Sequence, residues 1–406
     1  MITRRQALRS VGGMALGAGA GLMAGSRFAA LAAETITLPF GNGERPLVVY
    51  PGKRALIGLT ARPPQLETPF SVFNDGILTP NDAFFVRYHL ADIPLDIDPT
   101  AFRVEVKGKV ATPLSLSLDD LKTKFEPVEF VAVHQCSGNS RGFFQPRVGG
   151  GQAGNGLMGN ARWKGVPLKA VLEKAGIASG AVEVAFSGLD RPAMPQTPAF
   201  AKSLKLDHAL DGEVILAYQM NGTDLPWLNG FPLRLVVPGY FGTYWVKHLN
   251  QITVLDKPLD NFWMATAYRI PDNECACVPP GGKPEKTVPI GRFVVRSFLT
   301  NVLDGAKVAA GKPLPLRGIA FDGGSGIARV EVSADGGKSF APATLGEDLG
   351  KYSFREWRTS VTVPPGDHAI LVRATNVLGK SQPMEATWNP SGYMRNVVET
   401  TRIVAA

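Results

Sequence analysis

The stretch HQCSGNSR, residues 134–141, decides how the rest of this chain is interpreted. It follows an apolar run, residues 130–133, that predicts a strand, and its Ser, Gly and Asn residues predict a tight loop at the strand end. Cys136 is therefore expected where backbone approaches a ligand closely, as a metal-binding thiolate requires. Arg141 lies five residues on, and a cation beside a thiol can also bind an oxyanion. The alternatives are a buried free cysteine and, more weakly, a cysteine protease, for which no local nucleophile signature is present.

Length and composition favour a turn-rich protein of two or three domains. The chain has 406 residues, and at roughly 150 residues per domain that length allows two or three. Gly (45) and Pro (32) are abundant while charged residues are only 19%, a mix that argues against a coiled coil. The net charge of +8 includes four arginines that precede Glu34, the first acidic residue. The remainder is only mildly basic, so no nucleic-acid partner is expected.

Residues 1–33 predict an export signal. A charged start is followed by an apolar run at residues 11–24 and a small-residue cleavage site at residues 30–32. The pair Arg4-Arg5 is typical of a twin-arginine signal, with an ordinary secretory signal as the alternative. The twin-arginine route carries folded proteins, commonly with a cofactor inserted. We therefore expect a cofactor enzyme in the periplasm, with no membrane span elsewhere.

The mature chain predicts an α+β part followed by an immunoglobulin-like β-sandwich. Residues 34 to about 100 are rich in Pro and turn signals. Beyond them, alternation and apolar runs predict strands at residues 102–106, 128–133, 182–187, 214–218 and 233–237, and helices at residues 117–124, 168–175 and 203–207. Pro-Pro and Gly-Gly breaks predict a linker at residues 271–289. Short alternating runs, with a hairpin turn at Asp335-Gly336-Gly337, predict the sandwich at residues 290–406.

Three cysteines exclude a disulfide framework. Cys275 and Cys277 are separated by one residue, which closes too small a ring for an unstrained bridge and is poor support for zinc. We expect this pair to be structural or incidental. The sequence has no C-x-x-C-H motif, no iron–sulfur spacing and no dinucleotide-binding G-x-G-x-x-G. Electrons that leave this chain are therefore expected to pass to another protein.

Together these features resemble the sulfite oxidase family of molybdenum-pterin enzymes, across essentially the whole mature chain. The resemblance is carried by ordered stretches: FVRYH (85–89), CSGN (136–139) with Arg141, WKGVPL (163–168), GLD (188–190), LAYQMNG (216–222), NGFPLR (229–234), WVK (245–247) and VEVSADGG (330–337). It implies a molybdenum-pterin catalytic domain at residues 34–270 and the sandwich at residues 290–406.

The resemblance also implies the cofactor and the site residues. It implies molybdenum with one pyranopterin, no haem in this chain, and Cys136 as the metal ligand, in keeping with the soft thiolate that such a metal prefers. The implied cofactor-binding residues are Phe85, Arg87, Tyr88, His89, Cys136, Asp190, Asn229, Arg234, Trp245, Val246 and Lys247. The implied catalytic residues, which would line a pocket for an oxyanion that guanidinium groups suit, are Arg87, His89, Arg141 and Tyr268.

The implied reaction is oxidation of sulfite to sulfate, with electrons passed one at a time to a small c-type cytochrome in a heterodimer. One alternative is a periplasmic molybdopterin reductase of methionine sulfoxide or another oxo-acceptor, although that branch lacks the sandwich. Another is an assimilatory nitrate reductase, which usually has lysine where Arg141 stands. A binding-only protein would leave Cys136 and Arg141 unexplained.

Overall fold

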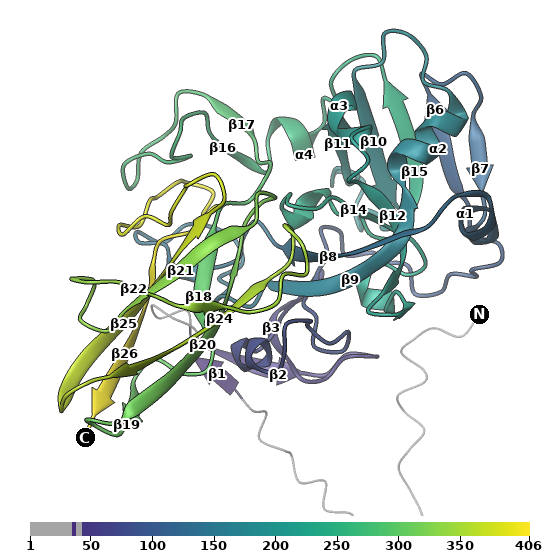
Figure 1. The fold of residues 1–406 in the computed structure, drawn as a ribbon. Coiled ribbons are helices and arrows are strands. Elements are labelled where there is room, and N and C mark those ends of the chain that lie inside the picture. Colours follow the sequence, from purple (N-terminus) through teal and green to yellow (C-terminus); the bar gives the residue numbers. More distant parts are fainter. Residues whose placement is uncertain (1–34, 38–42) are drawn as a thin grey trace, which may run out of the picture. The chain divides into compact units, whose positions relative to one another are not determined.

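The computed structural model describes residues 35–37 and 43–406, so the signal predicted at residues 1–33 lies outside the described residues. Those residues form sheets with four short α-helices up to Pro289, and two further sheets from Arg296 onward (Figure 1). The predicted α+β part followed by an immunoglobulin-like sandwich is confirmed, with strands far outnumbering helices. Within the described part of the chain, no helix has the length and apolar character needed to cross a membrane.

The last strand of the first sheet places Arg87 in the interior of the protein. It is antiparallel, in the order β1 (Thr35–Thr37), β2 (Glu44–Val48), β3 (Leu56–Ala61), β4 (Pro64–Glu67) and β5 (Val86–Arg87), with the 3-10 helix η1 (Phe70–Asn74) after β4. The Pro-rich composition of this region predicts turns instead. The sheet forms because Leu56, Leu66 and Val86 bury their side chains in one apolar cluster.

The second sheet runs in the order β11 (Ala201–Lys205), β10 (Glu183–Gly188), β15 (Leu249–Leu255), β6 (Val104–Gly108) and β7 (Leu114–Leu116). Only β15 and β6 pair in parallel in this sheet. The helix predicted at residues 203–207 is wrong: β11 pairs with β10 through Lys205, and helix α3 (Leu206–Ala209) follows. Lys202, Ser203 and Leu204 are all buried there, and this tertiary pairing overrides local helix propensity.

Two predicted helices have clear local causes. Ser117 caps the N-terminus of helix α1 (Leu118–Lys124), and its side chain and that of Asp120 form a capping box. Helix α2 (Leu168–Ala175) has the predicted bounds; it buries an apolar face and ends at Gly176, which has φ 68°.

The third sheet delivers Cys136. It runs in the order β13 (Thr223–Asp224), β12 (Ile215–Met220), β9 (Met158–Pro167) and β8 (Val128–Gln135), and β14 (Arg234–Val236) pairs with β12. The register places Gln135 opposite Met158, so Cys136 is the first residue beyond the paired end of β8. Short 3-10 helices flank the sheet: η2 (Arg141–Phe143), η3 (Trp227–Asn229) and η4 (Gly242–Tyr244).

The sandwich consists of two sheets. One runs β18 (Arg296–Leu299), β20 (Pro313–Phe321), β24 (Arg355–Thr362), β23 (Thr344–Leu345); the other runs β19 (Ala306–Val308), β26 (Glu399–Ala405), β25 (Gly366–Asn376), β21 (Ile327–Ser333), β22 (Ala341–Pro342). Their inner faces bury Trp357 among aliphatic side chains. The turn at Asp335 is stabilised by Ser333 Oγ, which donates to the Asp335 carboxylate (2.7 Å).

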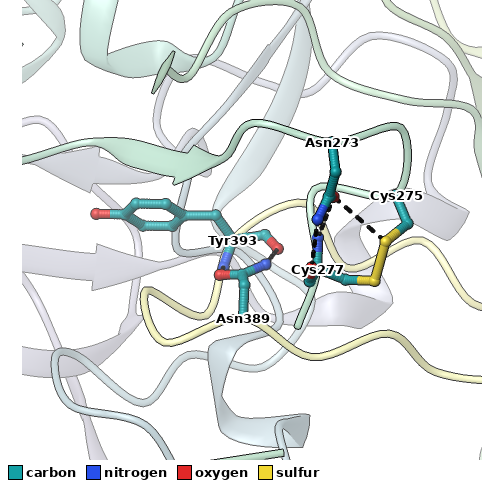
Figure 2. Close-up of a disulfide and its surroundings, with 5 residues drawn as sticks. All are labelled: Asn273, Cys275, Cys277, Asn389 and Tyr393. Atoms are coloured by element: carbon teal, nitrogen blue, oxygen red, sulfur yellow. Dashed lines mark hydrogen bonds between the residues drawn. A yellow bond between two sulfur atoms is a disulfide. The ribbon is translucent and has the colours of Figure 1, made fainter. Parts of the chain in front are cut away.

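Residues 271–289 differ from the predicted linker. β16 (Arg269–Pro271) and β17 (Thr287–Pro289) pair antiparallel, so the stretch between them leaves the sheet and returns to it. Within it Cys275 and Cys277 form a disulfide (Figure 2), against the expectation that so short a spacing stays unbridged. The positive φ of Ala276 (49°) bends the backbone and brings the two cysteine Cα atoms within 5.1 Å.

Arg296 joins the sandwich to the loop after β8. Its side chain is fully buried and donates to Ser140 Oγ (2.9 Å) and to Glu399 Oε1 (2.9 Å). Ser140 donates in turn to Asn155 Oδ1 (2.6 Å). The sandwich therefore contacts the loop at residues 136–141 through a buried, charge-assisted hydrogen bond, and the ion pair with Glu399 holds the guanidinium in place for it.

Candidate active site

One interior cavity gathers most of the predicted site residues. Of those predicted, only Asn229 and Arg141 are outside its lining. The lining comprises Phe85, Arg87, Tyr88, His89, His134, Cys136, Ser137, Asp190, Phe200, Arg234, Gly242, Thr243, Trp245, Val246, Lys247 and Tyr268.

Cys136 lies between this cavity and a second hollow. Its amide donates to Leu157 O (2.9 Å) and its carbonyl accepts from the amide of Asn139 (3.0 Å), which fixes the loop geometry. The half-buried free thiol lines both the cavity and what we call the outer groove, a hollow that includes Arg141, Trp263 and Tyr393. A group bound to this sulfur would therefore face a deep compartment and an outer one.

Positive charge is concentrated on the inner wall. Arg234 donates from its two Nη atoms to Asn229 O (2.8 Å) and Trp245 O (3.2 Å), and burial lowers its pKa to about 9. Lys247 lines the same cavity, and burial together with the charge on Arg234 lowers its pKa well below the ordinary value. Asp190 is the one carboxylate in the lining, and burial raises its pKa to about 6. This wall suits an anionic ligand.

Several polar atoms in the lining have no hydrogen-bond partner. A buried, unpartnered polar group costs about 1–3 kcal/mol, so a set of them indicates a ligand that hydrogen-bonds at many points. The set comprises His89 Nε2, His134 Nδ1, Ser137 Oγ, Arg234 Nε and Thr243 Oγ1.

The two histidines of the lining are held neutral. His89 stacks on Phe200, with ring centroids 3.7 Å apart, and burial followed by the charge on Arg87 lowers its pKa well below 6.5. His134 lies between Phe85 and Trp245, at 4.9 and 4.6 Å, and burial lowers its pKa in the same way. Both rings therefore offer one donor and one acceptor nitrogen at neutral pH.

The outer groove contains a second cationic surface. Burial lowers the pKa of Arg87, but the neighbouring Tyr268, Cys136 and Tyr393 together raise it above its ordinary value, so the guanidinium stays charged. Burial raises the pKa of Tyr268, which keeps its hydroxyl protonated. Arg141 donates from Nε to Ser391 O (3.2 Å) and is 5.0 Å from the centre of the Tyr393 ring.

Arg141 was predicted in one pocket with Arg87, His89 and Tyr268. The structure places it in the outer groove, which shares Arg87 and Tyr268 but does not include His89. The guanidinium packs closely against the backbone there, because a Cβ at Gly138 would lie 2.8 Å from it. A side chain at position 138 would therefore require the arginine to shift.

Asn229, which was predicted to bind the cofactor, is not among the residues that line the cavity. Its Oδ1 accepts from Lys53 Nζ (2.5 Å) and its Nδ2 donates to Phe85 O (3.1 Å). Its carbonyl accepts from Arg234. In this arrangement Asn229 ties Phe85 and Arg234 together.

Sequence reasoning missed three buried titratable groups and did not assign His134. Lys53 donates to Asn81 O (2.7 Å) and Phe84 O (2.9 Å), and Lys202 donates to Trp263 O (2.7 Å); burial lowers both lysine pKa values to about 7. Neither lysine lies in a recognisable motif. His134 lies in β8, two residues before Cys136. Because side chains two apart along a strand point to the same side, this spacing was the signal that His134 lies on the same side as Cys136.

Glu67 is the third missed group, and it holds the loop beside Cys136. Its two carboxylate oxygens accept from the amides of Gly154 (3.0 Å) and Gly156 (2.8 Å). Leu157, which accepts from the Cys136 amide, follows directly. Burial raises the pKa of Glu67 to about 7 despite those hydrogen bonds.

Comparison with known proteins identifies the family. The chain matches the model of the oxidoreductase molybdopterin binding domain at residues 90–263 and that of the Mo-co oxidoreductase dimerisation domain at residues 288–404. It is 33% identical to sulfite oxidase of Gallus gallus over 361 residues, which cover 85% of this chain and 76% of that protein. The chain belongs to the sulfite oxidase family.

Other members of the sulfite oxidase family and one solved structure agree with this membership. The mitochondrial sulfite oxidases of Mus musculus and Homo sapiens are each 34% identical over 82% of this chain, which spans 63% of their length. The crystal structure of the sulfane dehydrogenase SoxCD from Paracoccus pantotrophus superimposes with a TM-score of 0.71 at 25% identity, covering 84% of this chain and 85% of that one.

Molybdenum-molybdopterin is the cofactor of this family, and the cavity residues fit it. The phosphate of the pterin requires cationic side chains, and the lining contains residues of that type in Arg234 and Lys247; its unpartnered polar atoms suit a ligand rich in heteroatoms. Among residues 35–37 and 43–406, no three His, Cys, Asp or Glu side chains gather into a metal site. A metal held by Cys136 and by sulfur atoms of the pterin needs no such cluster.

We expect Glu67→Gln to change how stability depends on pH. Because the pKa of Glu67 is about 7 when folded and 4.5 ordinarily, the folded state keeps a proton that the unfolded state has lost. The wild-type free energy of unfolding therefore loses roughly 3 kcal/mol from this group as pH rises from 4.5 to 7. The variant lacks that decline, and it loses about 1–3 kcal/mol at pH 5 because its amide group faces a backbone amide.

Chemical denaturation of both proteins between pH 5 and 8 measures this difference. Glu126→Gln, at an exposed position, is the matched control and should keep the wild-type pH profile. Parallel profiles for Glu67→Gln and wild type would contradict the assignment.

Proposed function

We propose that this protein oxidises sulfite to sulfate at a molybdenum-pterin centre and passes the electrons singly to a c-type cytochrome. The observation that carries the proposal is the position of Cys136, whose thiol faces both the cationic cavity and the outer groove with Arg87, Arg141 and Tyr268. Proteins named sulfite oxidase, at 33–34% identity, support the choice of substrate.

The inner cavity would hold the cofactor. Arg234 and Lys247 would bind its phosphate, and His134, Ser137 and Thr243 would hydrogen-bond its ring system through atoms that have no protein partner. Cys136 would supply a thiolate to the metal. When bound, the molybdenum-pterin group supplies a two-electron oxidation with transfer of an oxygen atom to the substrate.

The outer groove would bind sulfite. Arg87 and Arg141 would neutralise the dianion, and Tyr268, protonated because burial raises its pKa, would donate a hydrogen bond to a sulfite oxygen. The indole of Trp263 and the ring of Tyr393 would limit the access of water. The charge on Arg87 is directed toward Cys136, so Arg87 would also stabilise negative charge that develops near the metal.

The electrons require an external acceptor. The sequence has no C-x-x-C-H motif, so a small c-type cytochrome, bound as a heterodimer partner, is proposed. Phe262 supports docking near the groove because it lines that hollow and is 43% exposed. The alternative of a methionine-sulfoxide reductase is less favoured, because β18–β26 form the sandwich that branch lacks.

We expect Cys136→Ser to abolish sulfite-dependent reduction of cytochrome c and of ferricyanide while the fold is retained. A serine oxygen is a harder and weaker donor to molybdenum than a thiolate. Initial rates and thermal unfolding of the purified variant measure both effects. A double variant, Cys275→Ser with Cys277→Ser, is the control that removes the other two cysteines and should remain active. Activity of Cys136→Ser above a few per cent would refute the ligand assignment.

We expect Arg87→Met to raise KM for sulfite and to lower kcat. Methionine keeps the apolar stem but deletes the charge, and the combined loss in kcat/KM should be on the order of 2–4 kcal/mol. His89→Ala should have a smaller effect, because a neutral imidazole contributes hydrogen bonds without charge. Steady-state kinetics separate the two parameters. Arg103→Met, at an exposed position, serves as the control, and an Arg87→Met enzyme with wild-type KM would exclude Arg87 from the substrate site.

We propose export to the periplasm through the twin-arginine route. Replacing Arg4-Arg5 by Lys-Lys should keep active, molybdenum-loaded protein in the cytoplasm, because that route requires the arginine pair. Activity and metal content of the two cell fractions measure the outcome. Active variant in the periplasmic fraction would point to another export route.

A further inference from the structure

The Cys275–Cys277 disulfide (Figure 2) belongs to the excursion between β16 and β17. Cys275 is exposed, whereas Cys277 is half-buried. Between them Ala276 has a φ of 49°, in the left-handed region, which is unfavourable for an L-residue. The disulfide is one of the constraints that hold Ala276 in this region, so the bond is both reachable and coupled to a strained backbone.

Asn273 holds the cysteine turn by contacts that do not depend on the disulfide. Its Oδ1 accepts from the Cys277 amide (3.1 Å), and its Nδ2 donates to Cys277 O (2.8 Å). The same Oδ1 lies 3.4 Å from Cys275 Sγ. The two sulfurs would therefore stay close together after the bond between them is broken.

The charges around the disulfide do not exclude an anion. A hollow on the same excursion is lined by two cations, Lys283 and Lys286, and two carboxylates, Asp272 and Glu285. These charges balance, and the further carboxylate of Glu274 is on the exposed side. A small dianion can therefore approach Cys275 without a strong net repulsion.

We propose that this disulfide is a covalent acceptor site for sulfite, the molecule that the proposed function brings to the enzyme. The lone pair on the sulfur of sulfite attacks the exposed Sγ of Cys275 and forms a new S–S bond. The bond between Cys275 and Cys277 breaks, and its electron pair leaves on Cys277 Sγ. One dianion and a neutral disulfide give one S-sulfonate anion and one thiolate, so the step needs no oxidant or reductant.

The adduct is reversible because the released thiolate stays beside it. Cys277 Sγ can attack Cys275 Sγ again, expel sulfite and restore the disulfide. Since Asn273 keeps the turn in place, this return step is intramolecular and has a high effective concentration. The site is therefore occupied while free sulfite is abundant and empties as sulfite is removed.

The adduct would form next to the outer groove. The amide of Val278, the residue after Cys277, donates to Trp388 O (2.8 Å). Asn389 follows Trp388 and brackets Tyr393: its Nδ2 donates to Tyr393 O (2.8 Å) and its Oδ1 accepts from the Tyr393 amide (3.1 Å). Figure 2 shows Asn389 and Tyr393 beside the disulfide turn. The modification site thus adjoins the wall of the proposed substrate groove.

Full-length Cys136→Ser protein, incubated with sodium sulfite without an electron acceptor, tests the proposal. This variant has no thiol outside the disulfide pair, so the intact mass should increase by one sulfurous acid and one thiol per chain should become alkylatable. Peptide mapping should place the sulfonate on Cys275 and the alkyl group on Cys277. Desalting before alkylation should return the original mass, and desalting after it should not.

Two controls isolate the cause. Ala276→Gly relieves the left-handed strain and should slow adduct formation several-fold, because glycine adopts this φ freely. Replacing Cys275 and Cys277 by serine should abolish the adduct.

Absence of an adduct under conditions that cleave oxidised glutathione, or a sulfonate only on Cys277, would overturn the proposal. None of these readouts requires turnover, so a failure of sulfite oxidation in the wild-type protein is seen separately in its own assay.

Discussion

Positive charge buried without enough negative charge is the constraint on which this structure depends. Arg87, Arg234 and Lys247 all line one cavity, and Asp190 is the one carboxylate among its lining residues. Each cation is partly compensated by backbone carbonyls, as Lys247 is by Arg87 O (2.7 Å), yet carbonyl dipoles do not neutralise charge. The protein maintains an interior that is completed electrostatically by an anionic cofactor. The fold around it acts as a frame that keeps these cations from separating.

The frame is built from residues far apart in the sequence. The first sheet supplies Arg87, the third supplies Cys136 and Arg234, and the sandwich closes over the loop between them through Arg296 and Ser140. The main apolar core also includes Phe298 and Phe321 of the sandwich, so the sandwich and the catalytic part are packed together as well as joined by this hydrogen bond.

Local chemistry explains which features were predictable from the sequence. The position of Cys136 just beyond the end of a strand was predictable, because an apolar run followed by Ser, Gly and Asn has few structural alternatives. The bounds of helix α2 were predictable because its apolar face and the glycine that follows it, Gly176, indicate the same helix. The contacts of Asn229 were not predictable from the sequence, because the same asparagine could hydrogen-bond a ligand or a lysine of the protein such as Lys53.

Long-range burial explains the features that were missed. The strand at residues 201–205 forms through pairing with β10, a contact that its own residues do not encode. The amino group of Lys53 and the carboxyl group of Glu67 are of types that are ordinarily solvated. Only the assembled fold shows that both are buried with backbone groups of distant loops as partners. The disulfide likewise depends on one backbone angle at Ala276, which a spacing rule does not contain.

The contact between Arg296 and Ser140 has a consequence for the order of events during synthesis. Strand β18, which carries Arg296, leaves the ribosome more than 150 residues after the loop it supports, and Glu399, which fixes the guanidinium, follows another 103 residues later. The loop that presents Cys136 therefore obtains all its contacts only after β18 and β26 have both been synthesised. A chain stalled before β26 would have the binding sequence but not its final shape, so cofactor loading depends on completion of the sandwich.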